Sequence, residues 1–172
     1  ASSTLWRSGG GKLSGTVREG AAPADAAATF ELTSPPLADV VRDINKYSNN
    51  VMAQQVFLTL GLVRKPSSGG TRSSTPEDGR EALQRWLRDR QGESLDGVVI
   101  DNGSGLSRNT RLSAALLARV LQRAWSSAVM PELMASLPGS GLDGTLRRSR
   151  GNPATIGRAH LKTGSLRDVQ TL

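Results

Sequence analysis

The sequence predicts an α+β fold in which helices pack on an antiparallel sheet. Apolar residues recur at helical spacing in several segments that open with capping residues, and short apolar segments near glycines are typical of strands. The 172 residues are enough to bury a core without disulfide bonds, and the chain contains no cysteine. Ordinary apolar packing is therefore expected to hold the elements together.

The opening stretch is predicted to form hairpin-like strands around residues 12–17, because glycines at 9–11 and at 20 are turn signals on either side. A helix is predicted next, over residues 36–47. Ser34 offers a capping hydroxyl there, and the prolines that follow fix φ ahead of apolar residues at helical spacing.

Ser48-Asn49-Asn50 interrupts this helical pattern, because serine and asparagine side chains favour local bonds to the backbone over helix interiors. Apolar periodicity resumes over residues 51–60, before Gly61. The triplet is therefore predicted to lie in the connection between two helices. A mobile polar linker is expected at about residues 64–75, where serine and glycine are frequent.

The second half of the chain alternates helices with short strands. Thr75 is a predicted helix cap, followed by a first-turn proline and first-turn acids, and that helix is expected to end before Gly92. The remaining predictions are a buried strand at 98–100, a tight turn near the site at 101–105, a helix at 113–126 with Leu116, Leu117, Val120 and Leu121 inward, a short helix from Pro131, a loop at 139–153 and a strand at 156–166.

Charge and composition exclude several classes of function. The net charge of +7 comes mainly from arginines spread along the chain, whereas a nucleic-acid site would gather them on one face, so no nucleic-acid partner is expected. No apolar run is long enough for a transmembrane segment. Without cysteine, any hydrolytic chemistry must use hydroxyls, carboxylates or the single histidine, His160.

Two triplets carry the chemistry of the chain. Ser48-Asn49-Asn50 alone is weak evidence, because a Ser-x-Asn triplet is common by chance, whereas Lys162-Thr163-Gly164 is rare in a chain with so few lysines. Together with Ser-x-x-Lys, such triplets mark the penicillin-recognising serine acyl-transferases. No lysine of this chain has a serine three positions before it, so the third motif is absent from the 172 residues.

The wider sequence around these triplets resembles the class C low-molecular-mass penicillin-binding proteins, which are D-alanyl-D-alanine carboxypeptidases and endopeptidases. The resemblance rests on three runs, at residues 34–53, 101–108 and 160–166. It implies a penicillin-binding, serine-β-lactamase-like transpeptidase fold, incomplete in this chain. Residues 1–172 would be the C-terminal portion of a single domain, beginning after the segment that carries the nucleophile.

Three residues are expected to be catalytic. The Ser48 hydroxyl both donates and accepts, so it can relay a proton to a leaving amine. The Asn50 amide can orient a peptide, and Lys162 would place a cation beside Ser48. The alternatives left open are a helix-junction serine, a turn asparagine and a solvated strand lysine.

Three further residues are expected to bind substrate. Thr163 can donate its hydroxyl to a terminal carboxylate, and Gly164 permits a close approach of substrate to the backbone. By resemblance, the Ser165 N–H would be one donor of an oxyanion hole. His160 shares strand parity with Lys162 but has no matched acid or serine, so no direct catalytic role is expected for it.

The resemblance implies a serine-type D-alanyl-D-alanine carboxypeptidase and endopeptidase that acts on peptidoglycan through an acyl-enzyme and binds penicillin. Its partners would be stem peptides ending in D-Ala-D-Ala and β-lactam antibiotics, with no metal or organic cofactor, in the periplasm. The chain alone is expected to be inactive. A non-catalytic module that binds cell-wall peptides is the alternative, and a β-lactamase fits the flanking segments less well.

Overall fold

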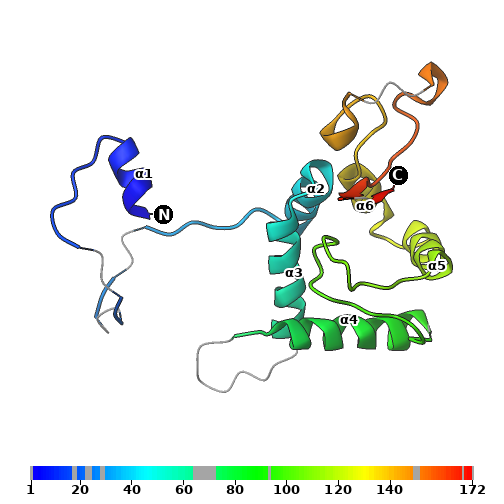
Figure 1. The fold of residues 1–172 in the computed structure, drawn as a ribbon, viewed down its shortest axis with the longest axis horizontal. Coiled ribbons are helices and arrows are strands. Elements are labelled where there is room, and N and C mark those ends of the chain that lie inside the picture. Colours follow the sequence, from blue (N-terminus) through cyan, green and yellow to red (C-terminus); the bar gives the residue numbers. More distant parts are fainter. Residues whose placement is uncertain are drawn as a thin grey trace. The chain divides into compact units, whose positions relative to one another are not determined.

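The structure is a computed structural model that describes residues 2–16, 19–21, 25–27, 30–63, 73–92, 94–148, 152–167 and 169–171 (Figure 1). The chain divides into two compact units, Ala1–Ser34 and Pro35–Leu172. The linker predicted at 64–75 lies outside the described residues except for its last three positions.

The first unit differs from the sequence prediction. It contains a short helix, α1 (Ser2–Ser8), and its described residues form no strand, so the predicted hairpin is wrong. The glycines at 9–11 instead fold the chain back over Trp6, whose indole Nε1 donates to the Lys12 carbonyl at 3.2 Å. A Cβ on Gly11 would lie 2.3 Å from the Trp6 ring, which explains the glycine there.

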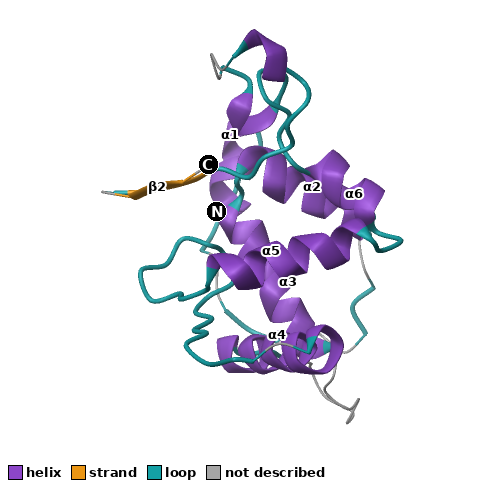
Figure 2. Cartoon of the chain, turned by 90° about the vertical axis from the view of Figure 1, so that its right-hand side faces the viewer, coloured by secondary structure: helices purple, strands orange, loops and turns teal. Residues whose placement is uncertain are grey.

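The second unit contains helices and one short antiparallel strand pair, in agreement with the predicted α+β class (Figure 2). Its elements are α2 (Leu37–Tyr47), α3 (Asn50–Leu62), α4 (Pro76–Gln91), α5 (Ala114–Trp125), α6 (Met130–Ser136), the 3-10 helices η1 (Gly144–Leu146) and η2 (Pro153–Thr155), and strands β1 (Gly164–Leu166) and β2 (Val169–Thr171). All the helices predicted after residue 35 are therefore confirmed.

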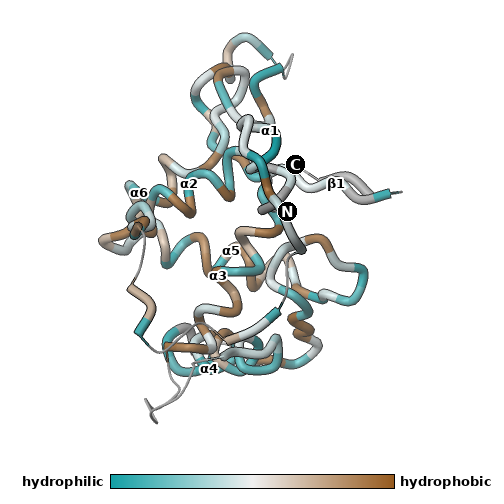
Figure 3. The backbone as a smooth tube through the Cα atoms, turned by 90° about the vertical axis from the view of Figure 1, so that its left-hand side faces the viewer, coloured by the Kyte–Doolittle hydropathy of each residue, from teal (hydrophilic) through white to brown (hydrophobic). Residues whose placement is uncertain are grey.

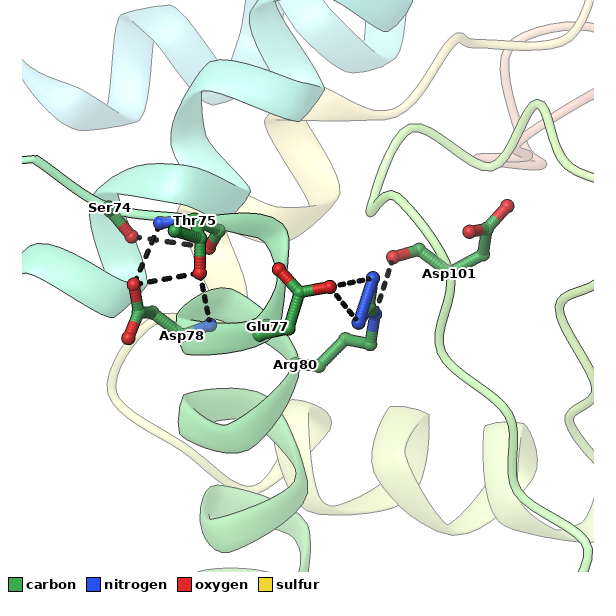
Figure 4. A network of polar contacts seen from close by, with 6 residues as sticks. All are labelled: Ser74, Thr75, Glu77, Asp78, Arg80 and Asp101. Atoms are coloured by element: carbon green, nitrogen blue, oxygen red, sulfur yellow. Dashed lines mark hydrogen bonds and ion pairs between the residues drawn. The ribbon is translucent and has the colours of Figure 1, made fainter.

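The two predicted helix caps have different outcomes. Pro36, not Ser34, occupies the N-cap of α2, no side chain caps that helix, and the Pro36 carbonyl accepts from the N–H groups of Asp39 and Val40. At α4 the predicted cap is confirmed (Figure 4). Thr75 Oγ1 accepts from the Asp78 N–H, while the Asp78 carboxylate accepts from the Thr75 N–H at 2.7 Å.

The core lies where α3, α4, α5 and the segment after α4 meet. Its buried members are Phe57, Leu87, Ile100 and Leu116. Figure 3 shows apolar residues along α3 and mostly polar residues along α4. Gly79 lets the two helices approach closely, because a Cβ there would lie 2.8 Å from the Phe57 carbonyl oxygen.

Helix α5 buries less of its apolar surface than predicted. Leu116 is buried and Val120 packs against the core, but Leu117 and Leu121 are 49% and 57% exposed. The four residues span an arc of the helix wider than the strip in contact with the core, to which Leu116 belongs and against which Val120 packs. The prediction that all four point inward is therefore wrong for Leu117 and Leu121.

The strands are shorter than predicted. The segment 98–100 makes only an isolated bridge between Val99 and Arg111, and the segment 156–166 forms regular strand only at β1, with an isolated bridge between His160 and Gly139. β1 pairs antiparallel with β2, so that Ser165 is opposite Gln170. Lys162 and Thr163 thus directly precede the strand. Among the described residues, no helix is long and apolar enough to cross a bilayer.

Candidate functional site

A groove of about 590 Å³ lies between the start of α3, the loop after residue 101 and the segment that enters β1. All six residues that the sequence predicts for the site line it: Ser48, Asn50, Lys162, Thr163, Gly164 and Ser165. Segments more than a hundred positions apart in the chain therefore meet at one surface. This convergence is what a site acting on one substrate bond requires.

Ser48 is held at the junction of two helices, as predicted. It ends α2 in the left-handed conformation, with φ of 52° and ψ of 48°, and it is the only described residue other than glycine with positive φ. Asn49 then caps α3 by accepting from the Met52 N–H at 3.1 Å, so that Asn50 begins the helix. Strain at a residue that lines a groove is typical of functional positions.

Lys162 makes the central contact of the groove. Its Nζ donates to Ser48 Oγ at 2.7 Å and to the Thr163 carbonyl at 2.9 Å. The predicted proximity of Ser48 and Lys162 is therefore confirmed. Burial lowers the pKa of the Lys162 ammonium below its usual value, because the surrounding protein removes part of its hydration.

The end of α2 is fixed by polar contacts just before Ser48. Asn45 Nδ2 donates to the hydroxyl of the fully buried Ser136 at 2.8 Å. Lys46 Nζ donates to the Leu137 carbonyl at 2.8 Å and to Asp143 Oδ2 at 2.5 Å. The bond from Lys46 also holds the pKa of the Asp143 carboxyl below its usual value, with help from the Gly139 N–H.

Residues 137–143 also support the segment before β1 that carries Lys162. The Leu161 N–H donates to the Pro138 carbonyl at 3.0 Å, and the Ser140 N–H donates to the Ala159 carbonyl at 2.9 Å. One loop thus contacts α2 on one side and the Lys162 segment on the other. The distance between Ser48 and Lys162 is set through this shared support.

The loop that follows residue 101 forms the opposite rim of the groove, as predicted, through Gly103, Ser104 and Gly105. Arg80 of α4 anchors it by donating from Nε to the Asp101 carbonyl at 3.2 Å (Figure 4). A Cβ on Gly103, whose φ is 69°, would lie 2.3 Å from Phe57. The loop therefore sits directly on the core.

Sequence reasoning did not identify every residue of the groove. It missed Ile44, Asn45, Asn49, Ala53, Leu106 and Leu117, which line it. It also missed Thr145, whose hydroxyl lies 2.9 Å from that of Thr163. Except for Asn49, the middle residue of the first triplet, these residues lie outside the two triplets, so only the fold reveals them. His160 lies on a separate apolar groove with Trp125 and Met134.

Comparisons with known proteins show the family of the chain. A family model described as D-Ala-D-Ala carboxypeptidase 3 (S13) matches residues 3–172. The chain is 31% identical over 146 residues to penicillin-sensitive carboxypeptidase A of Dictyostelium discoideum, covering 84% of the chain and 27% of that protein. It is 30% identical over 173 residues to a D-alanyl-D-alanine carboxypeptidase of Actinomadura sp. (strain R39), covering 96% of the chain and 31% of that protein.

Solved structures of a penicillin-binding protein are similar in fold to the chain. Penicillin binding protein 4 (dacB) from Haemophilus influenzae has a TM-score of 0.68 and 27% identity, with 78% of this chain and 29% of that chain covered. A structure of the same protein complexed with a β-lactam has a TM-score of 0.66 at 23% identity, with 95% and 37% covered, and shows the shared fold. The chain spans less than a third of the length of the two curated relatives.

Proposed function

Because the chain belongs to the D-Ala-D-Ala carboxypeptidase 3 (S13) family, we propose that it supplies part of the active site of a serine-type D-alanyl-D-alanine carboxypeptidase and endopeptidase. The observation that carries this proposal is the 2.7 Å contact between Lys162 Nζ and Ser48 Oγ. The two side chains come from the two triplets typical of penicillin-recognising acyl-transferases.

The direction of this hydrogen bond supports a proton relay. A lysine ammonium has donors and no acceptor, so Ser48 Oγ must accept and its own hydrogen is left to point elsewhere. When the nucleophile attacks the peptide carbonyl, its own proton passes to a base outside these 172 residues. As the C–N bond then breaks, the leaving nitrogen takes the Ser48 proton. Ser48 in turn takes one from Lys162, whose lowered pKa makes that transfer easier.

The other groove residues have roles in binding and orientation. Asn50 holds the peptide by its amide, which can donate to a carbonyl and accept from an N–H. Thr163 donates its hydroxyl to the terminal carboxylate of the substrate, and Gly164 keeps the backbone accessible beside it. The Ser165 N–H stabilises the developing oxyanion.

The nucleophile of the reaction comes from outside these 172 residues in this proposal. No serine of the chain precedes a lysine by three positions, which is the spacing that the chemistry of this class uses. The chain by itself then binds substrate without acylation. Ser48 is a relay and not the attacking group in this proposal, because no lysine lies three positions after it.

The substrate is a peptidoglycan stem peptide ending in D-Ala-D-Ala, and β-lactam antibiotics bind the same groove. The Haemophilus relative has been solved with a β-lactam, which supports this part of the proposal by analogy of fold. The protein acts in the periplasm, where such peptides are found. The alternative, a module that binds cell-wall peptides without cleaving them, is favoured only by the absent Ser-x-x-Lys.

The test is hydrolysis of a D-Ala-D-Ala pentapeptide by the natural full-length protein that contains this chain, with release of D-alanine as the measurement. Turnover that a β-lactam abolishes supports the proposal. Saturable binding of the pentapeptide without release of D-alanine would favour the binding module instead.

A further inference from the structure

Thr145 reaches the site from an element outside both motifs. It lies in η1, and its hydroxyl oxygen is 2.9 Å from that of Thr163 in the Lys-Thr-Gly triplet, 18 positions later. Either hydroxyl can donate in this pair. Thr163 is therefore not an isolated hydroxyl on the rim of the groove, because it is paired with a hydroxyl whose position is set by another part of the fold.

The residues around Thr145 fix it relative to α2. Gly144 has φ of 52°, and a Cβ there would lie 2.5 Å from the Lys46 carbonyl oxygen, so the backbone of η1 packs directly on the end of α2. Asp143 accepts from Lys46 Nζ at 2.5 Å and from the Gly139 N–H at 2.8 Å. Leu146, on the other side of Thr145, is only 5% exposed.

This anchoring connects the two motifs of the site. Lys46 lies two residues before Ser48, so an element attached to Lys46 is fixed relative to the Ser48 hydroxyl. The Thr145 hydroxyl is in turn hydrogen-bonded to the Thr163 hydroxyl, so Thr163 is also positioned relative to Ser48. The tripeptide Asp143-Gly144-Thr145 thus links the substrate-binding hydroxyl to the end of α2 through two hydrogen bonds and the close packing of Gly144.

The number of hydroxyl hydrogens decides what the Thr145 contact can do. Thr163 has one hydrogen, and it must point to the substrate if it is to bind a carboxylate, which has no hydrogen to give. Thr163 can then only accept from Thr145. The second hydroxyl therefore aligns the first and strengthens its donation, because a donor that also accepts is more polarised.

We propose that Thr145 is a positioning residue that aligns the Thr163 hydroxyl and so sets the preference of the site for substrates with a free terminal carboxylate. This inference rests on the proposed function and adds a specificity residue outside the two triplets. Loss of the Thr145 hydroxyl should weaken binding of the carboxylate and leave the proton relay at Ser48 and Lys162 intact.

The test compares Thr145→Val with Thr145→Ser in the natural full-length protein that contains this chain. Substrates are a D-Ala-D-Ala peptide with a free carboxylate and the same peptide as a terminal carboxamide. Thr155→Val is the matched control, since it removes a hydroxyl from η2 that bonds only to the local Asn152 carbonyl in the structure, at 2.8 Å. Thermal melting by circular dichroism checks that each variant is folded.

The expected result for Thr145→Val is a KM for the free carboxylate raised about threefold to tenfold, the loss typical of one hydrogen bond, with kcat and the carboxamide reaction unchanged. Thr145→Ser should restore the wild-type KM. The inference is overturned if a folded Thr145→Val variant keeps the wild-type ratio of kcat/KM for the free carboxylate to kcat/KM for the carboxamide. Equal slowing of both reactions is one such result. A wild-type protein that cleaves neither peptide overturns the proposed function, and this inference with it.

Discussion

Lys162 Nζ donates to Ser48 Oγ at 2.7 Å, although 114 positions separate the two residues in the chain. The contact exists because a single loop, 137–143, is bonded both to the end of α2 and to the segment before β1. Neither residue is held by its own motif alone. The geometry of the candidate relay therefore depends on side chains that no active-site motif contains.

The strained backbone of Ser48 predicts that two substitutions at this position differ in stability. Its φ of 52° is a conformation that glycine adopts without penalty and that costs other residues about 1–2 kcal/mol. We expect Ser48→Gly to be more stable than Ser48→Ala by about 1 kcal/mol, since both lack the hydroxyl and only alanine keeps the strain. Urea denaturation followed by circular dichroism measures this difference. An alanine variant at least as stable as the glycine variant would show that the junction is not strained.

Asp143 should contribute stability that is lost in acid. Its pKa is lowered in the folded state, chiefly by the bond from Lys46, so the folded protein holds the charged form more tightly than the unfolded chain does. The contribution is present above about pH 4, the unfolded value, and disappears as the pH falls through the lower folded value. Wild type should therefore have a higher Tm than Asp143→Asn at pH 7, and the two should converge toward pH 2.

The control for that comparison is Asp39→Asn, which removes an exposed ion pair with Arg42 on the first turn of α2. Such pairs stabilise little, so the control should differ less from wild type at pH 7. If the difference between wild type and Asp143→Asn does not change between pH 7 and pH 2, the carboxylate does not anchor η1.

Lys162 predicts the same direction of pH dependence as Asp143, but in the alkaline range. Burial lowers its pKa in the folded state, so at neutral pH its charge costs stability that a neutral side chain would not. As the pH rises from the lowered folded value to about 10.5, the unfolded chain binds more protons than the folded protein, and the stability contributed by this residue increases. The free energy of unfolding of wild type relative to Lys162→Gln should rise over that window. A constant or falling difference between pH 8 and pH 10.5 would contradict it.

How much of this architecture the sequence predicts depends on the range of the interactions involved. The helices α2, α4, α5 and α6 follow from apolar spacing and from local caps or first-turn prolines, such as the Thr75 capping box. These signals act within a few residues of one another, and the structure confirms them. The six residues predicted for the site all line one groove, and five of them lie in the two triplets whose chemistry guided the prediction, with Ser165 next to the second triplet.

The failures involve contacts between distant segments. Residues 98–100 and 156–163 look like strands, but each makes only one isolated bridge, to Arg111 and to Gly139 respectively. A strand requires a partner, and partners are not visible in local sequence. Thr145 was missed for the same reason, since its role depends on the approach of Gly144 to Lys46. The glycines at 9–11 signalled a turn correctly, yet that turn packs on Trp6 and not on a second strand.

The absence of Ser-x-x-Lys predicts how the 172-residue chain behaves toward penicillin. We expect no covalent adduct when the isolated chain is incubated with a labelled penicillin, because no serine in it has a lysine three positions later to activate it. Intact mass spectrometry detects the adduct, and a family protein with the full motif set is the positive control. A stoichiometric adduct on the chain would identify one of its own serines as the nucleophile.

The most direct test of the relay is a double-mutant cycle on Ser48 and Lys162, measured as kcat/KM for a D-Ala-D-Ala pentapeptide in the natural full-length protein. Each single change, Ser48→Ala or Lys162→Ala, should lower kcat/KM roughly a hundredfold, about 3 kcal/mol, as expected for loss of one preorganised catalytic contact. Lys12→Ala, in the separate first unit, is the control. If the pair works as one relay, the double variant should lose little more than either single variant. Losses that multiply, or a folded Lys162→Ala protein with wild-type kcat/KM, would contradict the account.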